Sequence, residues 1–347
     1  MNNRRAAVLV AGSWGTALAS VLADNGCKVN LWTRNPDQEE EINTKRQNQR
    51  FLPDFTIHEA IHATTSLAEA VEDAAFILLA APSSAMRDVA RSIKEFASDK
   101  AVLVHATKGF EPDTLQRMSA VIEEELPAWK DRVVVLSGPS HAEEVSRKCP
   151  TTIVVASRTA KEAEEAQDWL INPYFRVYTN PDVIGVEVGG ALKNIIALGA
   201  GLSDGLDFGD NAKAALLTRG LAEIARLGVS LGANPLTFAG LAGVGDLVVT
   251  CTSRHSRNWR AGYMLGQGQT LDEVLSTMGM VVEGVKTTRA AYLLSRKHGV
   301  EMPIAEQLYQ VLFENKPPRE AVEALMGRGR TNEMEEVAAE AAANWKE

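Results

Sequence analysis

The 347-residue sequence contains few cysteines, and their placement suits neither cross-links nor metal ligation. Cys27, Cys149 and Cys251 are an odd number, lie far apart in the chain and lack the spacing of metal ligands. No cluster of histidine and cysteine offers a metal site either. We therefore expect a reduced protein of the cytoplasm that needs no metal ion.

Positive charge is also scarce. The chain has 36 lysines and arginines against 45 aspartates and glutamates, which gives a net charge of -9 and an isoelectric point near 5.4. This balance argues against nucleic acid or an anionic membrane as the main partner. An anionic ligand would have to be held by positive charge gathered locally.

Long apolar runs are missing as well. No run of 18 apolar residues occurs, so we expect no membrane span. Residues 2–11 begin like a signal peptide, with two arginines before an apolar stretch, but the glycine-containing turn at residues 12–15 ends that stretch early. Apolar content of 45% and charged content of 23% are ordinary for a globular protein, and the length favours two domains.

The first strong pattern is an apolar run, a turn and a helical stretch over residues 8–19. Gly12 and Gly15 lie where a dinucleotide-binding turn needs close approach of the backbone to a diphosphate, but Val10 holds the place of the first glycine. Two readings follow. If Val10 is extended, the strand runs one residue further at no cost; if the turn needs a positive φ there, the valine lowers the affinity for the cofactor.

A second strand is predicted over residues 28–33, and Arg34 follows it. A dinucleotide's adenosine ribose is recognised at this point, where an acidic residue favours a free 2′-hydroxyl and an arginine suits a 2′-phosphate. The first acid comes only at Asp37. Arg34 is either a surface residue without a role in binding or a residue that lets the protein accept or prefer NADPH.

Strand and helix patterns then alternate as far as a strand at residues 152–155. Nearly continuous apolar strands separated by helices indicate an α/β fold with a doubly wound, Rossmann-like parallel sheet. Ligands bind at the carboxyl ends of such strands, which directs attention to residues 80–83, 107–110 and 137–140. In the last of these Ser140 has the spacing of a helix cap, so it is either a cap or a ligand contact.

The alternation stops near residues 178–181, and helical patterns follow. We therefore expect a dinucleotide-binding domain over residues 1–180 and an all-α, substrate-binding domain over residues 181–347. Lys193 and Asn194 interrupt an apolar helix in the second domain, where a partly enclosed amine could serve as an acid or base. Further on, residues 240–260 combine Asp246 with three arginines and several hydroxyls, which suits an anionic polyol.

Together these motifs resemble the bacterial NAD(P)-dependent glycerol-3-phosphate dehydrogenases, in matching order from about residue 6 to about residue 330. The motifs that carry the resemblance are Gly12-Ser13-Trp14-Gly15-Thr16-Ala17-Leu18, Lys108-Gly109, Leu136-Ser137-Gly138-Pro139-Ser140-His141-Ala142, Gly189-Gly190-Ala191-Leu192-Lys193-Asn194, Phe208-Gly209-Asp210-Asn211-Ala212-Lys213-Ala214 and Gly245-Asp246-Leu247 through Arg257-Asn258.

The resemblance implies a role for each matching residue. Lys193 would be the proton donor and acceptor, Lys108 would polarise the carbonyl, and Asp246 would complete the catalytic group. The implied substrate contacts are Lys108, Gly138, Ser140, Lys193, Asn194, Asp246, Thr250, Ser256, Arg257 and Asn258. The implied cofactor contacts are Gly12, Ser13, Trp14, Gly15, Arg34, Lys108, Ala142, Arg257, Val281 and Glu283.

The resemblance also implies the reaction, which is hydride transfer between NADPH or NADH and dihydroxyacetone phosphate to give sn-glycerol 3-phosphate for phospholipid synthesis. Two alternatives stay open at this point. One is another two-domain β-hydroxyacid-type dehydrogenase acting on a carboxylate, and the other is a dinucleotide-binding sensor without catalysis. The expected partner is a small phosphate compound, and a homodimer is left open.

Overall fold

The structure is a computed structural model, and it describes residues 4–330. The chain divides into two compact units, one reaching to Glu187 and the other beginning at Val188. This division falls inside a long helix, α8 (Val183–Gly205). The domain boundary predicted between residues 180 and 181 stays a prediction.

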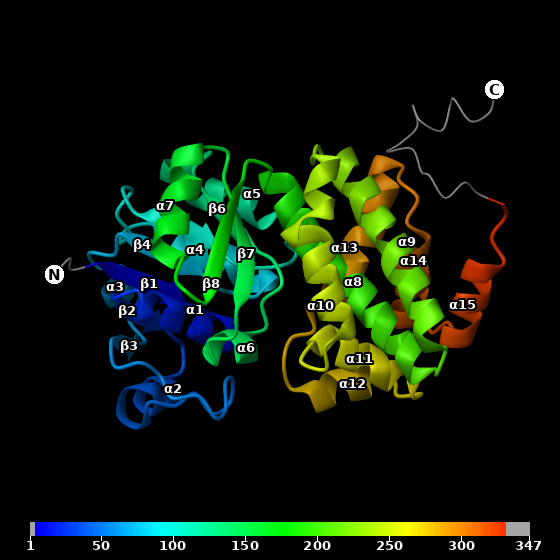
Figure 1. Cartoon of the computed structure of the whole chain (residues 1–347), viewed down its shortest axis with the longest axis horizontal. Helices are drawn as coiled ribbons and strands as arrows, with labels where there is room; N and C mark the ends of the chain where they lie inside the picture. The colour runs from blue at the N-terminus through cyan, green and yellow to red at the C-terminus, as the bar shows by residue number, and fades with distance from the viewer. Residues whose placement is uncertain (1–3, 331–347) are drawn as a thin grey trace. The chain divides into compact units, whose positions relative to one another are not determined.

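The first unit is built on one eight-stranded sheet with the strand order β3-β2-β1-β4-β5-β6-β7-β8 (Figure 1). Strands β1 to β6 are all parallel and follow the order of a doubly wound dinucleotide-binding sheet. The strands are β1 (Arg5–Leu9), β2 (Lys28–Trp32), β3 (Ile61–Thr64), β4 (Phe76–Leu79), β5 (Val102–His105), β6 (Val134–Ser137), β7 (Thr151–Ala156) and β8 (Phe175–Asn180).

Both faces of this sheet are buried. Alternate residues of β1 enter two separate apolar clusters, Ala6 and Val8 on one face and Ala7 and Leu9 on the other. Helices α1 (Ser13–Asp24), α6 (Ala142–Ser146) and α7 (Ala160–Leu170) supply the first cluster. Helices α3 (Leu67–Val71), α4 (Met86–Ser92) and α5 (Met118–Glu125) supply the second. The predicted α/β fold class is confirmed, because helices cover a mainly parallel sheet on both sides.

One pair of strands departs from the all-parallel sheet that the sequence predicts. β7 runs antiparallel to β6, and β8 then runs parallel to β7. The connection after β6 contains only α6, whose five residues span about 7.5 Å, whereas a four-residue strand is about 13 Å long. So short a helix does not return the chain to the opposite edge, and β7 starts where β6 ends.

The sequence reading also missed or misplaced smaller elements. The sequence pattern predicts neither β3 nor β8, and it predicts a helix over residues 113–125 that in the structure begins only at Met118. Residues 111–117 instead form a turn closed by a bridge between Phe110 and Arg117. The first unit also contains α2 (Pro36–Glu40) and the short helical turns η1 (Glu41–Lys45), η2 (Ser83–Ala85) and η3 (Pro127–Trp129).

The second unit is helical throughout its described part, up to Arg330 (Figure 1). After α8 come α9 (Gly209–Ser230), η4 (Pro235–Ala239), η5 (Leu241–Gly245), α10 (Asp246–Thr252), α11 (Arg257–Gly266), α12 (Leu271–Met278), α13 (Glu283–His298), α14 (Pro303–Phe313) and α15 (Pro318–Met326). The predicted all-α second region is therefore confirmed for the described residues.

Helix α8 is long and apolar enough to cross a membrane by length and composition alone. Its most apolar window has a mean hydropathy of 1.5, and 94% of that window is buried inside the protein. Burial of this extent is the environment of a core helix, so the helix is weak evidence for a span.

Candidate functional site

The sequence-predicted site residues fall into two sets, one on each unit. In the first unit they lie at the carboxyl edge of the sheet, where β1, β4, β5 and β6 are neighbours and all point the same way. The turn at residues 10–15 follows β1, Lys108 follows β5 and Gly138 follows β6. Parallel pairing therefore brings together segments that are up to about 130 residues apart in the sequence.

The turn after β1 has the positive backbone angle that the sequence left undecided. Val10 has φ of 85°, a region that favours glycine and is an outlier for a β-branched residue. The turn also brings the Val10 carbonyl so close to Gly15 that a Cβ on Gly15 would lie 2.2 Å from the oxygen. The positive φ of the second reading is therefore observed and Val10 occupies a strained position, whereas the lower affinity for the cofactor stays a prediction.

The start of α1 is open to an anionic group. No side chain caps this helix, and a Cβ added to Gly12 would meet nothing within 4 Å, so the backbone is open at that point. Ser13 turns inward and donates to the carbonyl of Phe51 at 2.5 Å, and Trp14 packs against the apolar core. Exposed N–H groups at a helix start carry partial positive charge, which suits a diphosphate.

A second group of predicted residues gathers on the carbonyl of Gly138. The Nζ of Lys108 donates to it at 3.0 Å and the Oγ of Ser140 donates to it at 2.9 Å. Gly138 has φ of +122°, and a Cβ there would lie 3.1 Å from Ile153 Cα, so glycine is required. Ser140 is not a helix cap, because His141 holds the N-cap position of α6 and no side chain caps that helix.

Two further residues of the first unit that are predicted to contact the cofactor are Arg34 and Ala142. Arg34 is exposed just beyond the end of β2, at the same carboxyl edge. Ala142 is buried and is the first residue of α6. The cofactor roles of both residues stay predictions.

In the second unit the central feature is a buried lysine–aspartate pair. The Nζ of Lys193, on α8, lies 2.5 Å from Oδ1 of Asp246 and donates to the Thr250 hydroxyl at 2.7 Å. Lys193 is 5% exposed and Asp246 is 1% exposed. Asp246 and Thr250 are four residues apart in α10, which places them on one helical face.

The glycines that precede Asp246 in the sequence suggest that it lies on a turn. The structure instead places Asp246 as the first residue of a helix. The amine of Lys193 donates to a carboxylate and to a hydroxyl. This arrangement holds the amine in one direction and stabilises its charged form.

Asn194, the residue after Lys193, is hydrogen-bonded through its side-chain amide to the amide of Asn258. Asn258 donates to Asn194 Oδ1 at 2.9 Å and accepts from the backbone N–H of Gly284 at 2.8 Å. Ser256 caps α11 by accepting from the Trp259 N–H at 3.2 Å, so a structural role is established for this predicted substrate residue. Arg257 is exposed at the start of α11.

The remaining two predicted cofactor residues flank the start of α13. Glu283 is the first residue of that helix, and Val281 lies two residues before it and is exposed. The fold brings α13 to the paired amides of Asn194 and Asn258 through Gly284, whose Cβ position would lie 2.7 Å from the carbonyl of Asn194. The cofactor role of both residues stays a prediction.

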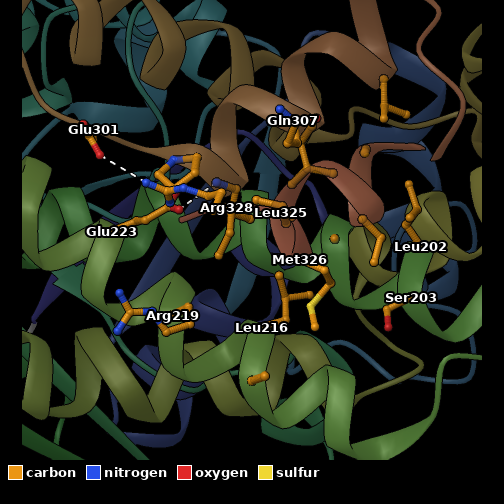
Figure 2. Close-up of a pocket in the computed structure, with 18 of the residues that line it drawn as sticks. Leu202, Ser203, Leu216, Arg219, Glu223, Glu301, Gln307, Leu325, Met326 and Arg328 are labelled. Carbon is orange, nitrogen blue, oxygen red and sulfur yellow. Dashed lines mark hydrogen bonds and ion pairs between the residues drawn. The ribbon is translucent and has the colours of Figure 1, made fainter. Parts of the chain in front are cut away.

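The helical unit also contains a large cavity that none of the predicted residues lines. It has a volume of about 1110 Å³ and lies among α8, α9, α14 and α15. Figure 2 shows Arg219, Glu223 and Arg328 among apolar residues on its walls, with Arg328 paired to Glu301 at 3.2 Å. Glu223 is buried and accepts from the backbone N–H groups of Ile304 and Ala305, so it caps α14.

Within residues 4–330 no group of three or more histidine, cysteine and carboxylate side chains could hold a metal ion. The three cysteines are free, and burial raises the pKa of the Cys27 and Cys251 thiols. Neither thiol is therefore poised as a nucleophile.

Sequence reasoning missed a second buried charge cluster, centred on Glu187 in the first turns of α8. Its carboxylate contacts His105, Arg117 and Ser119. The available signal was Glu187 itself, an acid in the same apolar helical run that Lys193 and Asn194 interrupt.

The fold and these residues first define a class. An α/β unit with a dinucleotide-type edge, followed by a helical unit with a buried lysine–aspartate pair, is the plan of a nicotinamide-dependent dehydrogenase. The chain belongs to the NAD-dependent glycerol-3-phosphate dehydrogenase family. The model of that family's N-terminal region matches residues 5–163, and the model of its C-terminal region matches residues 182–323.

Similar proteins agree with this assignment over nearly the whole chain. The glycerol-3-phosphate dehydrogenase (NAD(P)+) of Geobacillus kaustophilus (strain HTA426) is 60% identical over 95% of this chain and 96% of its own length. That of Bacillus subtilis (strain 168) is 58% identical over 96% of this chain and 97% of its own. The crystal structure of the Coxiella burnetii glycerol-3-phosphate dehydrogenase is 40% identical, covers 94% of this chain and 99% of its own, and superposes with a TM-score of 0.89.

Proposed function

We propose that the chain reduces dihydroxyacetone phosphate to sn-glycerol 3-phosphate with NADPH or NADH, and that it catalyses the reverse reaction. The observation that carries this proposal is the buried Lys193 amine held between Asp246 and Thr250. A proton donor fixed in this way suits reduction of a carbonyl, and the family to which the chain belongs adds independent support.

The first unit fits a dinucleotide. The uncapped start of α1 and the open backbone at Gly12 leave room and N–H donors for a diphosphate. Ser13, Trp14 and Gly15 would line the same turn, and exposed Arg34 would meet the adenosine ribose. Ala142, Arg257, Val281 and Glu283 would complete the cofactor contacts.

A bound nicotinamide cofactor would supply a hydride to the keto carbon. Lys193 donates a proton to the alkoxide oxygen that forms, and Asp246 and Thr250 keep its amine aimed and charged. Lys108 stabilises the same negative charge electrostatically from its place beside the Gly138 carbonyl.

The other predicted residues would bind the phosphate and hydroxyl groups. Arg257 supplies a guanidinium at a helix start, and Asn194 and Asn258 supply amides already oriented by each other. Gly138, Ser140 and Ser256 would supply further substrate contacts. Holding the remote phosphate in this way aligns the reacting carbon.

We further propose that the product feeds phospholipid synthesis and that the protein acts in the cytoplasm, where its three free cysteines stay reduced. A homodimer is a proposal that light scattering tests directly. It requires a particle of twice the chain's mass of 37.5 kDa.

The decisive experiment measures oxidation of NADPH and NADH with dihydroxyacetone phosphate, and with small keto acids for comparison. In Lys193→Ala, kcat is expected to fall by about 10³-fold or more while the affinity for NADPH changes little. Lys316→Ala, which removes an amine bonded to Gln307 and Gln310, is the matched control and should keep wild-type turnover. Near-normal turnover in Lys193→Ala, or faster reaction with a keto acid, would contradict the proposal.

A further inference from the structure

The Glu187 cluster lies outside the residues assigned to substrate and cofactor. Oε2 of Glu187 accepts from Arg117 Nη1 at 2.5 Å and from the Ser119 hydroxyl at 2.7 Å. Oε1 accepts from the backbone N–H of Ser119 at 2.7 Å and lies 3.2 Å from Nε2 of His105. All four residues belong to the first unit.

This carboxylate is unusually enclosed for an acid. The Glu187 side chain is 4% exposed and that of His105 is 0% exposed. Burial by itself raises the pKa of the Glu187 carboxyl, but the contact with His105 and the charge of Arg117 outweigh that effect and hold the pKa at about 2. A buried charge is costly unless it is paired and hydrogen-bonded, and Glu187 has both kinds of partner.

Two partners of Glu187 belong to regular elements, His105 to β5 and Ser119 to α5. His105 is the last residue of β5, and Lys108 follows it by three positions. Ser119 is the second residue of α5, so the carboxylate also stabilises the start of that helix. Glu187 itself lies on α8, which continues without interruption from Val183 to Gly205 and carries Lys193.

We propose that Glu187 is a positioning residue for both lysines of the proposed reaction. It ties the first turns of the Lys193-bearing helix to the end of the strand that leads into Lys108. Because α8 is one continuous helix and Lys193 follows Glu187 by six residues, holding the first turns of α8 also holds the part of the helix that carries Lys193. This inference rests on the proposed function, since it assigns the carboxylate a task in that reaction.

A purely structural ion pair is the alternative, and the same unit provides an example. Glu162 on α7 is 5% exposed and accepts from Arg132 Nε at 2.8 Å, and among the described residues no hydrogen bond or ion pair joins it to β5 or α8. Glu162→Gln is therefore a matched control, because it neutralises a similarly buried carboxylate away from both lysines.

The test compares wild type, Glu187→Gln and Glu162→Gln as full-length enzymes. In Glu187→Gln we expect kcat per folded enzyme to fall about 10- to 100-fold, the cost of a small misplacement of reacting groups. The kinetic isotope effect with NADPH deuterated at the transferred position should rise, because hydride transfer becomes rate-limiting. The NADPH dissociation constant from fluorescence titration should stay close to wild type, and Glu162→Gln should match wild type in all three.

Arg117→Lys is a second variant that keeps the test usable if Glu187→Gln does not fold. It keeps the positive charge but loses the guanidinium contacts with Glu187 and Ser119. It should show the same rise in isotope effect with a smaller loss of kcat. An active wild type with unchanged kcat and isotope effect in both variants would refute the positioning role alone. A wild type that fails to oxidise NADPH with dihydroxyacetone phosphate would refute the proposed function together with this inference.

Discussion

At Val10 a single backbone angle decides how the dinucleotide-type turn is made. The residue has φ of 85°, the place where glycine has no steric penalty and valine does. The turn needs this angle because the Val10 carbonyl folds back over Gly15. The valine therefore stores strain in the turn that is proposed to hold the diphosphate, as strained backbones at ligand sites often do.

The strain at Val10 is testable with two variants that both remove the apolar side chain. Val10→Gly should be more stable than Val10→Ala by about 1 kcal/mol, because only alanine keeps the Cβ that this angle disfavours. In extended or helical backbone the order is the reverse. Urea unfolding of both variants measures the difference, and Val10→Gly should bind NADPH more tightly than wild type. A more stable Val10→Ala would mean that the angle costs nothing.

Arg34 is the residue on which cofactor preference depends. It is exposed beyond β2, with Asp37 in the first turn of the helix that follows. A guanidinium there recognises the 2′-phosphate that only NADPH carries. Arg34→Ala should raise KM for NADPH about tenfold and leave KM for NADH nearly unchanged. Equal changes for both cofactors in steady-state assays would rule out recognition of the 2′-phosphate by this residue.

At the scale of the element, α8 depends on glycines that allow other backbones to approach. A Cβ on Gly262, in α11, would lie 1.9 Å from the carbonyl oxygen of Leu198, and a Cβ on Gly201 would lie 1.9 Å from that of Trp259. The two helices therefore pack backbone to backbone at these points. Close contact of this kind holds the helix that carries Lys193 in place within the second unit.

Gly262→Ala tests this packing, and Gly199→Ala in α8 is its matched control. The first variant should lose about 3 kcal/mol of unfolding free energy, because a carbonyl cannot move aside without shifting a helix. The second should stay within about 1 kcal/mol of wild type, because its Cβ would meet only the side-chain ends of Leu308 and Leu216, at 3.3 and 3.4 Å. Thermal and urea unfolding give both values; equal losses would show that α8 and α11 are not held by this contact.

At the scale of the whole molecule, the chain consists of two compact units with different architectures. The proposed diphosphate contacts lie at the sheet edge of the first unit, whereas α14 and α15 of the second unit carry none of the predicted site residues. Ligand binding stabilises most strongly the segments whose ordering it requires. The two regions should therefore respond differently to cofactor.

Hydrogen exchange with and without NADPH measures that response. Saturating NADPH should slow exchange at residues 10–15 and at the ends of β4 and β5, and should leave α14 and α15 close to their rates in the free protein. The walls of the large cavity then serve as an internal control in the same sample. A uniform slowing across both regions would mean that the chain opens as one cooperative unit.

Local patterns predicted much of this molecule. Apolar runs alternating with helical stretches predicted the sheet with helices on both faces, since burial on both sides requires nearly continuous apolar strands. The change in pattern near residues 178–181 predicted the helical region, and motif order predicted the family. Lys193 was singled out because it interrupts an apolar helix, where burying a charged amine is costly unless the amine is paired and hydrogen-bonded.

Other features were decided only by tertiary structure. The antiparallel direction of β7 follows from how far a five-residue helix can carry the chain. The partners of Lys193 lie at least 53 positions away along the chain and those of Glu187 at least 68, separations that no local pattern encodes. At Val10 the sequence and the tertiary structure each determined a different property of the same residue. The sequence identified the missing glycine, but only the folded turn set its φ, because that angle is imposed by the close approach of Val10 to Gly15.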